Sequence, residues 1–262
     1  MQTTSQYVSF DRAADYYDET RGFPPGVEHE AVALFVEAGH LTPHSRVLEI
    51  GVGTGRIALP LAPKVATYIG LDISLAMMRR LRQKHGGEQI ALIEGNAAHL
   101  PFATHSVDAV IAVHVFHLIQ NFVDVLEEIR RILRPGGMLL HGWNDRGTEN
   151  ALERTWREAT SHFEETTRTI SWEKRQTFLP EAGWRNVGGE LRHLYITERS
   201  PATYVQHLKE RKWSQTWRMT DEQMEAGIAA VEAYIAANHL NPMLPNQVEA
   251  TFNVQAFLPP HN

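Results

Sequence analysis

Apolar residues in this chain fall into short runs that alternate with amphipathic stretches from residue 46 to residue 143. Five runs have the length and apolarity of strands buried on both faces, at 47–50, 68–73, 90–93, 107–113 and 138–143. Three stretches carry apolar residues at helical spacing, at 27–38, 74–81 and 122–133. This alternation predicts a parallel sheet whose strands are joined by right-handed helical crossovers.

The regular alternation is lost after residue 143, and all six tryptophans lie from Trp143 onward. Residues 150–182 have a helical pattern, and Ser200-Pro201 predicts the start of a helix that continues to about Lys209. Thr220 to Gln223 match a capping box at the start of another helix. Two further strands are expected, at about 183–197 and at 248–257.

A glycine-rich turn follows the first predicted strand and leads into a helical pattern that begins at Arg56. Glycines at 51, 53 and 55 allow a ligand to approach the backbone, and some of these positions are expected to need a positive φ. Such a turn presents main-chain N–H groups and the positive end of a helix to the ligand. Because Arg56 stands where the dinucleotide fingerprint has its third glycine, that fingerprint does not match.

The second predicted strand ends with Asp72, which is well placed to accept hydrogen bonds from the two ribose hydroxyls of an adenosine. Gly95-Asn96-Ala97, followed by Leu100-Pro101-Phe102, comes after the third strand, and Arg134-Pro135-Gly136-Gly137 precedes the fifth. Together with Glu49 and the glycine turn, these motifs resemble the class I S-adenosylmethionine-dependent methyltransferases. The best match is to their small-molecule, type 11-like branch.

The resemblance implies an α/β fold with a Rossmann-like, seven-stranded, mostly parallel sheet, whose last strand is antiparallel and whose two faces carry helices. Residues 1–143 would form the cofactor-binding core with an N-terminal lid segment. Residues 144–262 would add the last two strands and two helical cap insertions, at about 144–182 and 199–240. The tryptophans of this cap would line an enclosed substrate cavity, or else form the core of the cap itself.

The resemblance also implies which residues contact S-adenosyl-L-methionine. They are Tyr17, Arg21, Glu49, Gly51, Gly53, Gly55, Asp72, Ile73, Met77, Asn96, Ala97 and His114. Three of these assignments have open alternatives. Tyr17 belongs to a short helix expected over residues 10–18, and Arg21 follows that helix. This segment could instead pack on the edge of the domain. Met77 lies in a helix capped by Ser74, with Leu75, Met78 and Leu81 on its apolar face, so it could belong to the core.

Asn96 departs from the family pattern, which has an acid that accepts a hydrogen bond from the adenine amino group. An amide oxygen can make the same contact, and the amide NH₂ can also donate to a ring nitrogen. The substitution removes one negative charge, and we expect cofactor binding to survive it.

Two histidines after the fourth strand are the candidates for catalysis. His114 and, three residues on, His117 would lie near the transferred methyl group, and histidine has a suitable pKa for a general base. The alternative is that they orient the substrate or pack at the rim. A metal site formed by this pair is not supported, because no carboxylate stands at a recognisable spacing.

The composition limits the class of partner and the cellular location that we expect. The formal charge of −6, from 25 basic and 31 acidic residues with no basic run, argues against a nucleic-acid partner. The absence of cysteine excludes disulfides and thiolate chemistry, and no apolar run is long enough for a membrane span. We expect a cytoplasmic monomer or homodimer that acts on a small organic molecule.

Two other functions stay open at this point. One is a non-catalytic protein that binds S-adenosylmethionine and acts as a regulator. The other is an NAD(P)-dependent oxidoreductase, which the mismatch at Arg56 disfavours.

Overall fold

The structure is a computed structural model that describes residues 10–119, 121–145, 149–161 and 177–260. The chain divides into two compact units. The first, here called the core unit, is formed by Met1–Asn144, Arg168–His193 and Phe252–Asn262. The second, the helical unit, is formed by Asp145–Thr167 and Leu194–Thr251.

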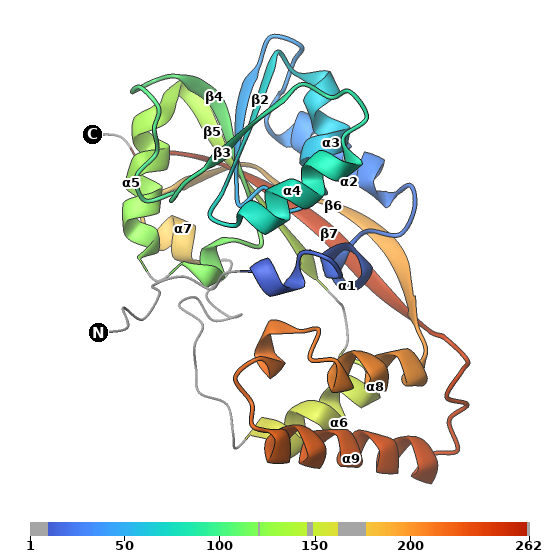
Figure 1. Cartoon of the computed structure of the whole chain (residues 1–262). Helices are drawn as coiled ribbons and strands as arrows, with labels where there is room; N and C mark the ends of the chain where they lie inside the picture. The colour runs from blue at the N-terminus through green and yellow to red at the C-terminus, as the bar shows by residue number, and fades with distance from the viewer. Residues whose placement is uncertain (1–9, 120, 146–148, 162–176, 261–262) are drawn as a thin grey trace. The chain divides into compact units, whose positions relative to one another are not determined.

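The strands of the described residues form one seven-stranded sheet and are labelled in Figure 1. They are β1 (Arg46–Ile50), β2 (Thr67–Asp72), β3 (Ile90–Glu94), β4 (Val107–Val113), β5 (Leu133–Asp145), β6 (Arg185–Arg199) and β7 (Asn246–Leu258). Their order is β3-β2-β1-β4-β5-β7-β6, and β1 to β5 are parallel. Among the neighbouring strands β5, β7 and β6, one strand is antiparallel. The sheet is therefore mostly parallel, which confirms the predicted Rossmann-like fold.

Helices cover both faces of the sheet within the core unit (Figure 1). Their bounds are Tyr17–Arg21 (α1), Val27–Ala38 (α2), Ala58–Leu61 (α3), Leu75–Lys84 (α4), Phe122–Ile132 (α5) and Phe178–Glu181 (α7), with 3₁₀ turns at Asp11–Ala13 (η1), Ala62–Lys64 (η2) and Phe116–Leu118 (η3). On one side α5 and α7 pack on the sheet through a cluster that includes Ile129, Phe178 and Trp184. On the other side lie α2, α3 and α4 (Figure 1).

Helix α4 begins where its sequence predicts, because the Ser74 hydroxyl accepts a hydrogen bond from the Met77 N–H at 3.2 Å. Its apolar face is turned relative to the prediction. Met77, Met78 and Leu81 are buried, whereas Leu75 is 41% exposed. Leu75 is the first residue of the helix and lies at the ligand end of the sheet, where packing against the core stops.

Two predicted helices are shorter than the sequence pattern indicated. In place of one helix over 10–18, a 3₁₀ turn at Asp11–Ala13 is followed by α1, which starts only at Tyr17. After the glycine turn, α3 has four residues and gives way to a 3₁₀ turn that contains Pro63. Two prolines in this stretch, Pro60 and Pro63, remove N–H donors, so little helix dipole is directed at a ligand.

The helical unit has a core of its own. It contains α6 (Ala151–Thr160), α8 (Pro201–Lys209), the 3₁₀ turn η6 (Ser214–Thr216) and α9 (Asp221–Ala237), together with parts of β6 and β7. The predicted caps are present: Ser200 accepts from the Thr203 N–H at 3.1 Å, and Thr220 and Gln223 form a capping box. Buried side chains that include Trp156, Leu208 and Val231 form the core.

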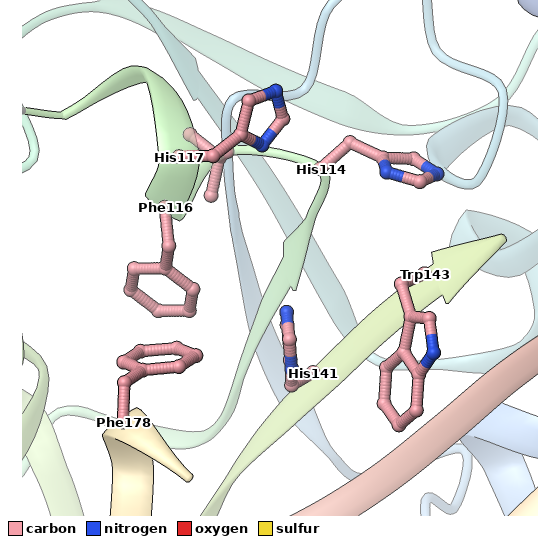
Figure 2. A pocket seen from close by; sticks show the side chains of 7 residues that line it. His114, Phe116, His117, His141, Trp143 and Phe178 are labelled. Atoms are coloured by element: carbon pink, nitrogen blue, oxygen red, sulfur yellow. The ribbon is translucent and has the colours of Figure 1, made fainter. Parts of the chain in front are cut away.

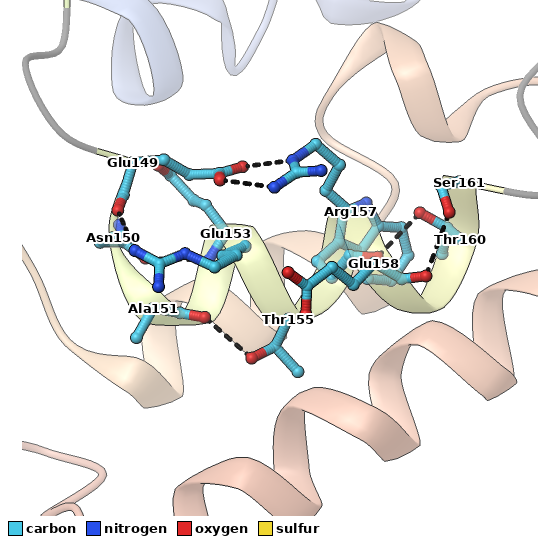
Figure 3. A network of polar contacts seen from close by, with 11 residues as sticks. Glu149, Asn150, Ala151, Glu153, Thr155, Arg157, Glu158, Thr160 and Ser161 are labelled. Atoms are coloured by element: carbon cyan, nitrogen blue, oxygen red, sulfur yellow. Dashed lines mark hydrogen bonds and ion pairs between the residues drawn. The ribbon is translucent and has the colours of Figure 1, made fainter.

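Polar contacts hold the start of α6 (Figure 3). Asn150 caps the helix by accepting from the Glu153 N–H at 2.9 Å. Arg157 donates two hydrogen bonds to the carboxylate of Glu149, at 2.9 and 3.0 Å, so the ion pair is bidentate (Figure 3). These contacts explain why the helix begins at Ala151.

The tryptophans are divided between the two units. Trp143 and Trp184 are buried in the core unit. Trp156 is buried in the core of the helical unit, and the half-buried Trp213 packs against that core. Trp172 lies outside the described residues. That the helical unit caps the substrate site stays a prediction.

Candidate functional site

The glycine turn after β1 meets the end of β2. Gly51 and Val52 both donate their main-chain N–H to the carbonyl oxygen of Leu71, at 2.7 and 3.1 Å. The Gly53 N–H donates to Oδ2 of Asp72 at 2.8 Å, and the Ser74 N–H donates to Oδ1 of the same carboxylate at 2.8 Å. The acid predicted to bind the ribose therefore lies directly beside the predicted ligand turn.

Glycine is required in this turn by the backbone conformation. Gly51, Gly53 and Gly55 have φ angles of +70°, +55° and +83°, a region that other residues rarely adopt. A methyl group added to Gly55 would also lie 2.6 Å from Cγ of Leu81. The prediction that some of these glycines need a positive φ is confirmed.

Asp72 keeps room for further hydrogen bonds. Each oxygen of its carboxylate accepts one main-chain N–H, and a carboxylate oxygen can accept more than one donor. Partial burial raises the pKa of Asp72, while the N–H donors of Ser74 and Gly53 act to lower it. The side chain is thus fixed by the turn and still able to bind two hydroxyl groups.

Glu49, near the end of β1, is the most deeply buried acid of the site. It is 2% exposed, and its Oε2 accepts a hydrogen bond from the Tyr68 hydroxyl at 2.7 Å. Burial raises the pKa of Glu49 to about 8, although the bond from Tyr68 and the charge of Arg56 act in the opposite direction. The predicted contact of Glu49 with the cofactor stays a prediction.

The remaining predicted cofactor residues occupy the ends of β2 and β3. Ile73, directly after Asp72, is 40% exposed. Met77 is only 3% exposed, but its Cε would lie 3.4 Å from a Cβ added to Gly53, so it packs under the turn.

Asn96 lies two residues beyond β3, and the Asp72–Glu94 register pair places it at the same end of the sheet as Asp72. Its Oδ1 accepts the Ala98 N–H at 2.9 Å, which forms an Asx turn. Ala97 is nearly buried in this turn. The amide oxygen therefore has a defined place in this turn, and its predicted contact with an adenine stays a prediction.

The N-terminal segment lies against the glycine turn. Asp18 accepts from the Thr54 hydroxyl at 2.5 Å and pairs with Lys84 at 2.8 Å, and Asp11 accepts from the Ser74 hydroxyl at 2.5 Å. The Arg56 guanidinium donates to the carbonyl oxygen of Arg21 at 2.8 Å. The segment that carries the predicted lid residues thus contacts the ligand turn directly.

Within this segment, Tyr17 and Arg21 lie together. The guanidinium of Arg21 is 5.5 Å from the ring centres of both Tyr17 and Phe10. Their predicted contacts with the methyl donor and its carboxylate stay predictions.

A pocket beside the end of β4 collects aromatic and histidine side chains (Figure 2). Its lining is formed by His114, Val115, Phe116, His117, His141, Trp143 and Phe178. The two predicted catalytic histidines therefore line one pocket. The ring of His141 is 5.1 to 5.7 Å from the rings of Trp143, Phe116 and Phe178. The pocket lining thus combines aromatic rings with the polar nitrogens of three histidines.

His114 has an unusual backbone and a defined side-chain partner. Its φ is +51°, and its Nε2 lies 2.7 Å from Oδ1 of Asn144 at the end of β5. Left-handed residues other than glycine occur often at functional sites, where the surrounding structure holds them in place. No group of three or more His, Asp or Glu side chains within the described residues has the arrangement of a metal site.

Sequence reasoning missed two residues of the pocket region, His141 and Asn144. The sequence at each position has a feature that could have identified it. His141 is a polar residue inside an apolar strand, and Asn144 is a polar residue next to the last residue of β5. Phe178 could not be assigned, because it comes from a helix far along the chain.

Comparison with known proteins bears on the same region. Residues 48–141, from β1 into β5, match a family described as a methyltransferase domain. This segment is a methyltransferase domain. The family predicted from the glycine turn and Asp72 is therefore confirmed for the part of the chain that carries both.

Relatives of the methyltransferase domain include enzymes with different acceptors. A fatty-acid O-methyltransferase of Mycolicibacterium smegmatis is 40% identical over 98 residues, which cover 37% of this chain and 36% of that protein. A malonyl-[acyl-carrier protein] O-methyltransferase of Methylococcus capsulatus is 33% identical over 153 residues, which cover 57% of this chain and 55% of that protein. The chain thus spans about a third to just over half of these relatives.

Among solved structures, the YcgJ protein of Bacillus subtilis has a similar fold. It superposes with a TM-score of 0.53 at 18% identity, over 89% of this chain and 100% of its own. This likeness supports the sheet topology beyond the matched domain. Among the described residues, no helix is long and apolar enough to cross a membrane.

Proposed function

We propose that this protein is an S-adenosylmethionine-dependent methyltransferase that acts on a small organic acceptor. The observation that carries the proposal is the pair of 2.8 Å hydrogen bonds through which Asp72 joins the glycine turn to the start of α4. This arrangement places a two-oxygen acceptor beside Gly53, which has no side chain, and this suits the ribose of an adenosine. The methyltransferase domain match covers these residues.

Each part of the cofactor has a counterpart in the chain. Gly51 to Gly55 would lie against the methionine portion, Asp72 would accept both ribose hydroxyls, and the exposed Ile73 would pack on the adenine. Asn96 would accept a hydrogen bond from the adenine amino group through its side-chain oxygen. Arg21 would pair with the cofactor carboxylate. When bound, S-adenosylmethionine supplies an activated methyl group.

The pocket of His114 and His141 would form the part of the acceptor site nearest the transferred methyl group. It lies at the carboxyl ends of β4 and β5, the edge of the sheet at which ligands bind in open α/β folds. Its aromatic lining favours an apolar, flat acceptor, and its histidines offer hydrogen bonds to an oxygen. The chain would mainly align the acceptor with the methyl group and exclude water.

Thermal unfolding with different cofactors tests the proposal. S-adenosylmethionine and S-adenosylhomocysteine are expected to raise the melting temperature, because a ligand that binds the folded state stabilises it. Stabilisation by NAD or NADP alone would instead support the oxidoreductase. Mass spectrometry of an acceptor panel, with a fatty acid, a phenol and an alcohol, then separates an enzyme from a regulator. A protein that binds the cofactor and methylates none of them would favour regulation.

Replacing Asp72 by alanine is expected to weaken the binding of S-adenosylhomocysteine by roughly 1–3 kcal/mol, or about 5- to 150-fold. The variant loses the acceptor for two ribose hydroxyls and two main-chain N–H groups. Calorimetry measures the effect. Glu94→Ala is the matched control, because Glu94 is exposed and pairs with Asp72 in register on the next strand. Equal affinities of the two variants would remove Asp72 from the site.

A further inference from the structure

Asn144 contacts the candidate base His114 in two ways. Strand β5 runs parallel to β4, with Val113 beside Gly142, so the ends of both strands lie next to each other. Oδ1 of Asn144 is 2.7 Å from Nε2 of His114, and the main-chain N–H of Asn144 points to the same nitrogen at 3.2 Å. A single ring nitrogen thus faces one acceptor and one donor.

Arg56 identifies which amide atom faces the histidine. Its Nη1 lies 3.3 Å from Oδ1 of Asn144, and a guanidinium can only donate. The atom must therefore be the oxygen. Arg56 is itself held by the carbonyl oxygen of Arg21 at 2.8 Å and by the ring of Phe23, whose centre is 4.4 Å from the guanidinium carbon.

The two contacts favour opposite tautomers of a neutral His114. The amide oxygen needs a proton on Nε2, whereas the main-chain N–H needs Nε2 without one. The contact to the oxygen is 0.5 Å shorter (2.7 against 3.2 Å), so it is the stronger hydrogen bond. The neutral ring then carries its proton on Nε2 and its lone pair on Nδ1.

We propose that Asn144, held by Arg56, is a positioning residue that keeps His114 in the Nε2–H tautomer, so that Nδ1 accepts the proton of a hydroxyl acceptor. This inference rests on the proposed function. The acceptor oxygen forms its bond to the methyl carbon, the carbon–sulfur electron pair returns to sulfur, and the hydroxyl proton moves to Nδ1. The resulting imidazolium keeps its Nε2–H bond to the amide oxygen, which is then charge-assisted.

The proposal also narrows the acceptor class. A base is needed only where the reacting atom carries a proton, so a phenol or an alcohol fits this site and an ionised carboxylate does not need it. With three aromatic rings in the pocket lining, a phenol is the better match.

Nitrogen NMR of the full chain with saturating S-adenosylhomocysteine tests the tautomer. The His114 signals are assigned by their loss in His114→Gln. In the wild type we expect a protonated Nε2 and an Nδ1 without a proton. Asn144→Ala removes the amide oxygen and keeps the main-chain N–H that points to Nε2, so His114 is expected to change to the Nδ1–H tautomer. Asn144→Asp keeps an oxygen and should retain the wild-type tautomer. His29, on α2, should not change in any variant.

A wild-type His114 with its proton on Nδ1 would overturn the proposal, as would an Asn144→Ala variant with unchanged ring signals. Calorimetry on the same samples reports cofactor binding separately, so a failure of the proposed function is visible as absent binding. With a phenol acceptor, Asn144→Ala should lower kcat at least tenfold while the KM for S-adenosylmethionine stays the same. Asn144→Asp should restore most of the rate. Equal kcat in the wild type and Asn144→Ala would also contradict the positioning role.

Discussion

Replacing Glu49 by glutamine is expected to remove a large pH dependence of folding stability. Burial raises the pKa of Glu49 to about 8, whereas its ordinary value is 4.5. Between these two values the folded state holds a proton that the unfolded state releases. The wild type therefore loses stability as pH rises from 4.5 to 8, by roughly 3–5 kcal/mol, and the loss levels off above 8.

Urea unfolding at several pH values from 5 to 9 measures this effect. The glutamine variant cannot ionise at this position, so its stability relative to the wild type should rise from pH 5 to about 8 and then level off. A constant offset from the altered hydrogen bond to Tyr68 does not change the slope. Glu94→Gln is the control, since Glu94 is exposed and should follow the wild type. Parallel curves for Glu49→Gln and the wild type would show that Glu49 ionises normally.

Replacing Gly55 by alanine is the second change with a large expected effect. Its φ of +83° is unfavourable for alanine by roughly 1–2 kcal/mol. The added methyl group would lie 2.6 Å from Cγ of Leu81 and 3.3 Å from Cγ of Leu59, which adds roughly 1–3 kcal/mol of overpacking. Unfolding in urea should show the sum of both terms.

Gly136 offers a matched control for this change. Its φ is +81°, but a methyl group added there would meet no atom within 4 Å. Gly136→Ala should therefore show only the conformational term, and the difference between the two variants gives the overpacking in the glycine turn. Equal losses would mean that Leu81 moves aside and that the turn is not closely packed against α4.

The sheet and the cofactor turn could be predicted because their signals are local. A buried strand, alternate glycines and an acid at the end of the next strand each occupy a few consecutive residues. The carboxyl ends of neighbouring parallel strands must meet at one edge, so the contact between Gly53 and Asp72 follows from topology. The short α3 was also predictable, since Pro60 and Pro63 stand in the sequence.

The acceptor pocket and the N-terminal contacts could not be predicted in the same way. The partnership of His114 with Asn144 depends on the register of β4 against β5, and a shift of one residue would separate them. Asp11 lies in a 3₁₀ turn and Asp18 in the short helix α1, and the sequence of two such short elements does not indicate which side chains of the core they contact. These acids accept hydrogen bonds from Ser74 and Thr54, whose positions are set by the folded core and not by the N-terminal segment.

A crystal structure of the full chain with S-adenosylhomocysteine tests the central claim most directly. We expect both ribose hydroxyl oxygens within hydrogen-bonding distance of the Asp72 carboxylate, with the homocysteine portion against Gly51–Gly55. Ligand bound at another edge of the sheet, or a ribose whose hydroxyls do not reach Asp72, would contradict the account.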